Sequence, residues 1–110
     1  MIDWDRVAAL KEEVGAEDFD EVIELFLVEV DEEIDALNAV PPGNPLQEKL
    51  HFLKGSALSL GFSQFSNLCQ SGESALQSDP SAVVDLGAIH ESYQASREVF
   101  LADLPSKLAG

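Results

Sequence analysis

Apolar residues recur along the chain with the spacing of an α-helix rather than the alternation of a β-strand. One apolar stripe follows Asp18 and consists of Phe19, Val22, Ile23, Phe26, Val30, Ile34 and Leu37. Another follows Pro45 and consists of Leu46, Leu50, Leu53, Ala57 and Leu60. No stretch of alternating β-branched residues interrupts this pattern. The sequence therefore predicts an all-α fold.

Cap residues and helix breakers divide the chain into five predicted helices. The residues expected to cap helix N-termini are Asp3, Asp18, Asn44, Ser63 and Asp79. Those expected to end helices are Gly15, the Pro41-Pro42-Gly43 sequence and Gly61, the last in a left-handed conformation. The first helix spans about residues 4–14. The other four are longer, and the fifth is expected to begin just after Asp79-Pro80 and to turn residues from Val83 onward towards the core.

The loops between the long helices are only a few residues long, which favours antiparallel neighbours. The predicted architecture is an antiparallel up-down-up-down four-helix bundle, with the short additional N-terminal helix covering one end. With 110 residues, of which 45% are hydrophobic, the chain fits one compact domain with one modest core over residues 1–110.

The net charge of −15 argues against nucleic-acid binding, which depends on lysine and arginine neutralising phosphates. Residues 1–35 hold fourteen acids and two bases, which accounts for −12 of the total. Residues 44–78 hold two acids and two bases and are neutral overall. The acidic part is typical of a solvated helix face. The neutral middle of the chain is the part that requires an explanation.

Cys69 is the only cysteine, so no internal disulfide can form, and its place on an apolar stripe predicts a core residue. The first residues lack the charged and apolar regions of a secretory signal. The longest uncharged stretch, residues 55–72, is rich in Ser, Gln, Asn and Gly and does not suit a bilayer. We expect a cytoplasmic protein without a membrane span. No feature demands a dimer, so a monomer is expected.

The third predicted helix carries the candidate chemistry. Its apolar stripe defines the buried direction, and at roughly 100° per residue this places His51 on the outer side with Lys54 on its flank. Gly55 also lies outward, inside a helix, where glycine costs about 1 kcal/mol relative to alanine. Bulky apolar residues on outward or lateral positions suggest that something docks there. The predicted docking residues are Phe52, Leu58, Ser59 and Phe62.

Folding the third and fourth helices together about Gly61-Phe62 places residue 51 level with about residue 72, so Glu73 is a candidate neighbour of His51. A carboxylate that accepts a hydrogen bond from one ring nitrogen leaves a lone pair on the other, aimed outward. A phosphoryl group added there brings two negative charges, which Lys54 can partly offset. The small residues Gly55 and Ser56 leave room for a bulky partner to approach.

At this point the sequence resembles the histidine phosphotransfer (HPt) family of two-component phosphorelays. The resemblance rests on the block His51-Phe52-Leu53-Lys54-Gly55-Ser56-Ala57 and on the following Leu60-Gly61-Phe62. It implies a phosphohistidine at His51, a lysine at Lys54 that helps to hold the phosphoryl group, and Glu73 where members carry Glu or Gln bonded to the histidine.

The resemblance also implies the partners. They are response-regulator receiver domains and a hybrid or chemotaxis-type sensor histidine kinase. Transfer catalysis belongs to the receiver, which brings Mg²⁺, so the chain itself is expected to need no cofactor. It is expected to be a phosphoryl carrier rather than an enzyme.

Several alternatives are weighed against this hypothesis. An acyl carrier protein needs an Asp-Ser-Leu sequence, which is missing, and an independent enzyme needs a concave pocket, which the outer face of a helix does not suggest. A metal site is not expected, because His51 and His90 lie on different helices, and His90 is interpreted as structural. The serious alternative is an HPt-like docking module that binds a receiver or kinase without carrying phosphate.

Overall fold

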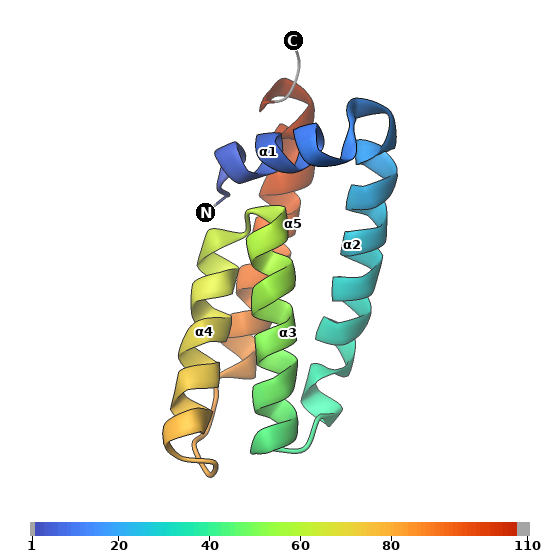
Figure 1. The fold of residues 1–110 in the computed structure, drawn as a ribbon. Helices are drawn as coiled ribbons and strands as arrows, with labels where there is room; N and C mark the ends of the chain where they lie inside the picture. The colour runs from blue at the N-terminus through green and yellow to red at the C-terminus, as the bar shows by residue number, and fades with distance from the viewer. Residues whose placement is uncertain (1, 108–110) are drawn as a thin grey trace.

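The computed structural model describes residues 2–107, and all its principal elements are helices. In chain order they are α1 (Trp4–Val14), α2 (Ala16–Ala36), a single 3₁₀ turn η1 (Leu37–Ala39), α3 (Asn44–Leu60), α4 (Ser63–Ser78) and α5 (Leu86–Lys107). Figure 1 shows the four long helices side by side, with successive helices running in opposite directions. The predicted up-down-up-down bundle is therefore confirmed.

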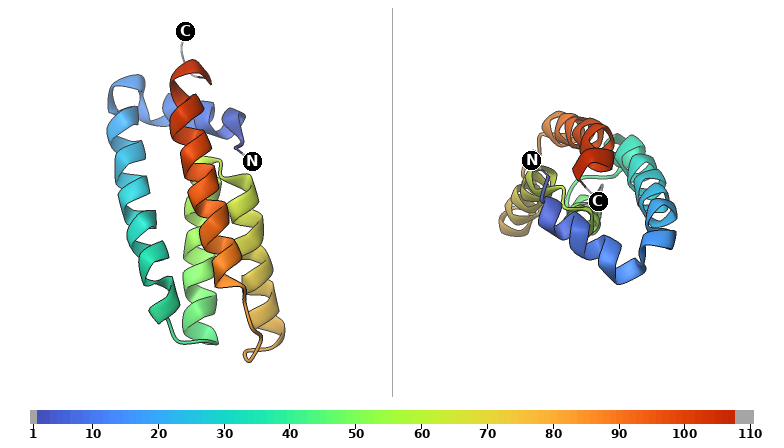
Figure 2. Two further views of the ribbon diagram at one scale, coloured as in Figure 1. Left: turned by 180° about the vertical axis from the view of Figure 1, so that it is seen from behind. Right: turned by 90° about the horizontal axis from the view of Figure 1, so that it is seen from above.

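Helix α1 lies across one end of the bundle, where α2 and α4 begin and α3 ends (Figures 1 and 2). Asp3 caps it as expected, since its Oδ1 accepts a hydrogen bond of 3.1 Å from the backbone N–H of Arg6. The backbone N–H of Asp3 donates to the carbonyl of Gly61 over 2.7 Å, which ties the start of the chain to the turn between α3 and α4. The short helix therefore closes the bundle at the end of that hairpin.

The core lies between the long helices and contains the predicted apolar stripe of the third helix. All five of its members are buried: Leu46, Leu50, Leu53, Ala57 and Leu60. On α2 the stripe is displaced slightly, since Leu27 is buried whereas Val22 and Phe26 are only partly so. Gly61 has φ of 79°, the left-handed conformation that the sequence predicted. Its absent Cβ would lie 2.6 Å from the carbonyl oxygen of Asp3, so glycine also permits the contact with α1.

Phe62 was predicted to be a docking residue, and this prediction is wrong. Its side chain has no exposed surface and packs edge-on against Phe100 and at a tilt against Tyr93. The backbone of Phe62 pairs with Ile2 in an isolated antiparallel bridge. The periodicity of the third helix did not reveal this, because Phe62 lies beyond the helix and is covered by aromatic rings of α5.

Several helix starts differ from the predicted ones by one to three residues. Gly15 both ends α1 and precedes α2, so Asp18 lies in the first turn of α2 rather than at its cap. Gly43 and Phe62 occupy the N-cap positions expected for Asn44 and Ser63. Acidic residues in a first turn still interact favourably with the helix dipole. The displaced start of α3 leaves its predicted buried face unchanged.

The start of the fifth helix was predicted about six residues too early. Asp79 forms a local turn instead, in which its Oδ1 accepts hydrogen bonds from the backbone N–H and the hydroxyl of Ser81. Helix α5 begins at Leu86, and the side chain of Asp85 accepts from the backbone N–H of Ala88 over 3.0 Å. Val83, which was expected to point inward, is 97% exposed in the loop.

Candidate functional site

Helix α3 presents His51 to solvent on its outer side. The preceding Leu50 and the second residue on, Leu53, are completely buried, so the helix orientation is determined by the core. The imidazole of His51 is 69% exposed, as the sequence predicted. His51 is therefore held on a rigid element whose inward side is packed, while its ring remains accessible to a partner.

Helix α4 approaches α3 closely at the level of His51. A Cβ added to the buried Gly72 would lie 2.8 Å from Cδ1 of Leu50 and 3.0 Å from Cγ1 of Val84. Only glycine fits between these side chains without displacing them. This close approach brings the next residue of α4, Glu73, within reach of the residue that follows Leu50, which is His51.

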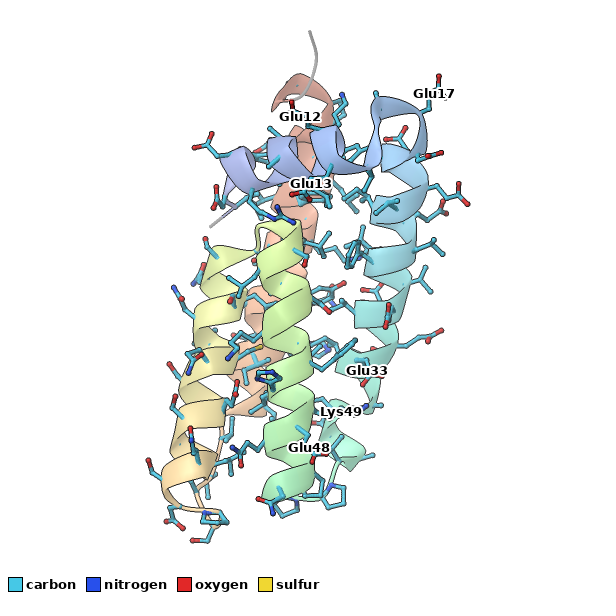
Figure 3. The ribbon with its side chains drawn as sticks, in the orientation of Figure 1. Glu12, Glu13, Glu17, Glu33, Glu48 and Lys49 are labelled. Atoms are coloured by element: carbon cyan, nitrogen blue, oxygen red, sulfur yellow. The ribbon has the colours of Figure 1, made fainter. Side chains whose placement is uncertain are left out.

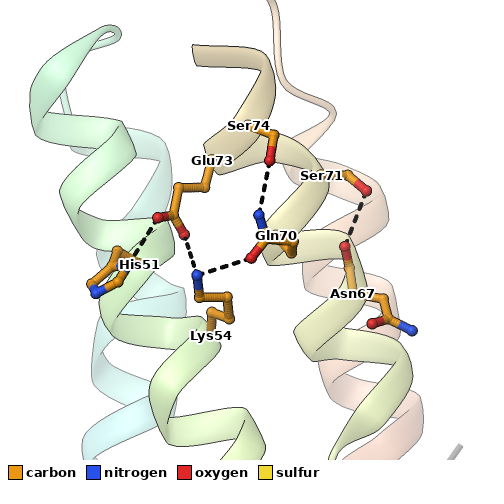
Figure 4. Close-up of polar contacts among 7 residues, drawn as sticks. All are labelled: His51, Lys54, Asn67, Gln70, Ser71, Glu73 and Ser74. Atoms are coloured by element: carbon orange, nitrogen blue, oxygen red, sulfur yellow. Dashed lines mark hydrogen bonds and ion pairs between the residues drawn. The ribbon is translucent and has the colours of Figure 1, made fainter. Parts of the chain in front are cut away.

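Glu73 connects the histidine to a lysine (Figure 4). Its Oε1 lies 2.8 Å from Nδ1 of His51, and its Oε2 lies 3.0 Å from Nζ of Lys54. An ionised carboxylate can only accept hydrogen bonds, so Nδ1 carries the proton in the neutral ring. The lone pair then lies on Nε2, on the opposite side of the ring from Glu73. The predicted proximity of His51 and Glu73 is confirmed.

The pKa of Glu73 lies below its ordinary value. Burial by itself raises this pKa, but hydrogen bonds from Lys54 and His51 and the positive charge of Lys54 lower it by more. Only 15% of the Glu73 side chain is exposed, so these interactions are partly protected from solvent. Glu73 is therefore ionised at neutral pH, as its role as a hydrogen-bond acceptor for His51 requires.

Gln70 also contacts the lysine, and sequence reasoning missed it. Nζ of Lys54 donates to Oε1 of Gln70 over 2.9 Å, while Nε2 of Gln70 donates to the hydroxyl of Ser74 over 2.8 Å (Figure 4). Gln70 lies three residues before Glu73 and hence on the same face of α4. That spacing was the available signal, but many surface glutamines share it.

The remaining predicted site residues surround the histidine on α3. A Cβ on Gly55 would have no neighbour within 4 Å, so Gly55 is not a helix-packing contact and the space above it is open. Phe52 and Leu58 are 38% and 56% exposed, and Ser56 and Ser59 are half-buried. Phe52, Leu58 and Ser59 all lie within four residues of Gly55 and are called the docking patch below.

Two hollows border this face. An open cavity of about 340 Å³ adjoins the histidine and is lined by Asn44, Gln47, Glu48, His51 and Glu73. A larger groove, of about 660 Å³, separates α2 from α3 and has Phe52 in its wall. Lys49 and Glu33 form an ion pair across that groove (Figure 3). This face is therefore more hollowed than the sequence suggested. Of the residues that line the first cavity, His51 and Glu73 also take part in the polar contacts of Figure 4.

Other candidate groups are placed away from this chemistry. Cys69 is completely buried, and burial, followed by the negative charge of Glu73, raises the pKa of its thiol to about 12. His90 is exposed on α5. Within residues 2–107, no group of three or more His, Cys, Asp or Glu side chains could hold a metal ion. None of the helices in this described part is long and apolar enough to cross a membrane.

Comparison with protein families decides what this bundle is. The family model of the Hpt domain matches residues 21–99, from the first turns of α2 to the last turns of α5. The chain belongs to the Hpt domain family. The matched region contains His51, Lys54 and Glu73, together with Gln70 and the docking patch. Comparisons with curated proteins and with solved structures found no match.

Membership defines the general function. Hpt domains are phosphocarrier modules rather than catalysts, and they interact with receiver domains and kinases in phosphorelays. This Hpt domain therefore has a phosphotransfer-related function in two-component signalling.

Proposed function

We propose that His51 of this Hpt domain accepts a phosphoryl group from the aspartate of a response-regulator receiver and returns it to such an aspartate. The observation that carries the proposal is the hydrogen bond of 2.8 Å between Nδ1 of His51 and Glu73 on an otherwise exposed ring. It leaves Nε2 unprotonated and directed to solvent, which is the state that a nucleophile needs.

The transfer step balances without a further reactant. The lone pair of Nε2 attacks the phosphorus of the receiver's aspartyl phosphate and forms an N–P bond. The P–O bond to the aspartate breaks, and its electron pair leaves with the aspartate carboxylate. The ring becomes positively charged while Nδ1 keeps its proton, and the carboxylate of Glu73 offsets that charge. The return transfer reverses each of these changes.

Lys54 and Gly55 have separate roles in this proposal. The phosphoryl group adds about two negative charges beside Glu73, and the ammonium of Lys54 is the positive group that lies one turn from the histidine. The open space above Gly55 allows a receiver active site to reach the ring. Mg²⁺ and the acids that bind it are supplied by the receiver, so this chain acts by positioning and electrostatics.

The docking patch gives the receiver a surface beside the histidine. Phe52 and Leu58 expose apolar area on either side of Gly55, where a partner would cover it. Residues 44–78 carry no net charge, so an acidic receiver pocket meets little repulsion at this hairpin. The proposed source of the phosphoryl group is a sensor kinase of the hybrid or chemotaxis type. The kinase passes it either to the receiver or directly to His51.

A labelling experiment tests the proposal. The protein is incubated with Mg²⁺ and a receiver domain carrying radiolabelled aspartyl phosphate, and label transferred to the Hpt domain is tested for loss in acid and retention in base. His51→Gln is expected to abolish labelling. His90→Gln is the matched control, because the chain has two histidines and His90 is also exposed on a long helix. This control is expected to be labelled at the wild-type rate.

The outcomes separate a carrier from a docking module. Label on the wild type and on His90→Gln, but not on His51→Gln, supports the carrier function. If the wild type binds receivers yet takes no phosphate from them or from small phosphodonors, the chain is a docking module and the proposed carrier function is wrong. Circular dichroism of His51→Gln checks that the helices remain.

A further inference from the structure

The ammonium of Lys54 is held by two side chains of α4, which is more than a surface lysine usually has. It lies 3.0 Å from Oε2 of Glu73 and 2.9 Å from Oε1 of Gln70. As a result, only 20% of the Lys54 side chain is exposed. Lysine has a flexible four-carbon stem, and one exposed ion pair seldom fixes it. The second acceptor restricts the ammonium to the space between α3 and α4.

The amide of Gln70 is oriented for this contact by its own partners. Its Nε2 donates to the hydroxyl of Ser74 over 2.8 Å, so its Oε1 faces the lysine. A reversed amide would place an N–H donor against the ammonium, which is also a donor. Gln70 and Ser74 therefore present an acceptor to Lys54 in one orientation.

We infer that Gln70 is a positioning residue for phosphotransfer, which keeps Lys54 next to Glu73 and ready for the phosphoryl group; this inference rests on the carrier function proposed for His51. A neutral amide suits the position. It binds the ammonium without cancelling its charge, whereas a second carboxylate would oppose the two negative charges of the incoming group. Gln70 itself does not contact the reacting atoms and acts through Lys54.

Two near-isosteric substitutions separate the effects of contact and charge. Gln70→Met keeps the length of the side chain but removes the acceptor, and it is expected to slow phosphotransfer to His51 about threefold to tenfold, the range for one lost hydrogen bond. Gln70→Glu keeps an acceptor but adds a negative charge. It is expected to slow transfer as well, by a factor that shrinks as salt is raised.

A double-mutant cycle distinguishes positioning from a structural effect. Gln70→Met is combined with Lys54→Ala, and the transfer rate from a phosphorylated receiver is measured for the four proteins. If Gln70 acts through the lysine, Gln70→Met has no further effect once Lys54 has been replaced by alanine. The matched control is Gln64→Met, an exposed glutamine at the start of the same helix, which is expected to transfer at the wild-type rate.

Each result bears on the inference in a defined way. Equal rates for Gln70→Met and the wild type overturn it. An equal slowing by Gln70→Met with and without the Lys54→Ala substitution also overturns it, since Gln70 would then act on the fold or on the receiver. Failure of the wild type to take up phosphate has a different meaning, because it overturns the carrier function first. Thermal unfolding of each variant verifies that the bundle is intact.

Discussion

Helix α3 forms a Lys–Glu ion pair on each of its two sides, and the two pairs differ in surroundings. Lys49 pairs with Glu33 of α2, and Lys54 pairs with Glu73 of α4. The first pair is the more exposed: the side chains of Lys49 and Glu33 are 40% and 27% exposed, against 20% and 15% for the second. Helix α2 carries ten acids and no base, whereas Glu73 is the only acid of α4.

This difference explains why only one of the two ion pairs belongs to the candidate phosphotransfer site. The carboxylate of Glu73 is shared with a histidine, and its neighbourhood is neutral, so a negatively charged phosphoryl group can be accommodated there. Glu33 has acids beside it on the same helix and pairs with a lysine that lies on the far side of α3 from Glu73. The packing also differs, since α3 contacts α4 far more extensively than α2. The closely packed hairpin of α3 and α4 holds His51, Lys54 and Glu73 next to one another.

The largest expected effect compares two phenylalanines, Phe52 on the groove beside the Lys49–Glu33 pair and Phe62 in the core beyond the end of α3. Phe62→Ala is expected to destabilise the fold by about 3–5 kcal/mol, because its ring is completely buried and packs against Tyr93 and Phe100 of α5. Phe52→Ala, on the groove towards α2, is expected to cost less than about 1 kcal/mol while weakening receiver binding. Urea unfolding and a receiver binding titration measure the two quantities. Equal destabilisation by the two substitutions would contradict the structure.

The next effect compares the two lysines. Lys54→Ala is expected to slow phosphotransfer or shorten the lifetime of the phosphohistidine by about tenfold or more, since a bond between charged groups is lost near the phosphoryl group. The control Lys49→Ala removes the ion pair on the other side of α3 and is expected to leave both quantities unchanged. Rates with a phosphorylated receiver provide the measurement. A similar slowing by both substitutions would show that charge on α3, rather than the site, matters.

A smaller effect tests the neutrality of the hairpin. Asn67→Asp and Gln77→Glu together add two charges to the face of α4 that carries Gln70 and Glu73. They are expected to slow transfer a few fold at low salt and not at high salt. Glu29→Gln with Glu32→Gln, which removes two charges from α2, is the comparison and is expected to leave the rate within about twofold. A salt-independent difference would argue against an electrostatic cause.

The smallest effect concerns pH. The folded-state pKa of Glu73 is below 4.5, so its ionised form stabilises the fold at pH values above 4.5, and this contribution disappears as pH falls below that value. Relative to Glu73→Gln, the wild type is therefore expected to lose part of its stability in that acidic range. Urea unfolding of both proteins at pH 7 and at lower pH tests the sign. A stability difference that grows on acidification would contradict it.

Much of the site could be predicted because it depends on local geometry. The outward position of His51 follows from the helical period of Leu50, Leu53 and their neighbours. The proximity of Glu73 follows from the short turn between α3 and α4, which ties the register of the two helices. The burial of Phe62 could not be predicted in this way, because it depends on the packing of Tyr93 and Phe100 of α5, which are distant in sequence.

The fifth helix shows a limit of local signals. Asp79-Pro80 has the composition of a helix start, but Asp79 uses its side chain to close a turn with Ser81, and the helix begins only at Leu86. A helix start and a local turn at Asp79 would both provide acceptors for backbone N–H groups of the same few residues. The residues around Asp79 do not by themselves decide between the two.

By itself, the sequence determined the all-helical class, the buried face of α3, and the His-x-x-Lys-Gly block that it exposes, because each follows from residue spacing on a single helix. Only the tertiary structure decided that Gly72 brings α4 close to α3, that Gln70 and Ser74 hold Lys54, and that Phe62 lies in the core. These features depend on side chains from different helices meeting within a few ångströms, and a residue pattern along one helix does not specify such distances.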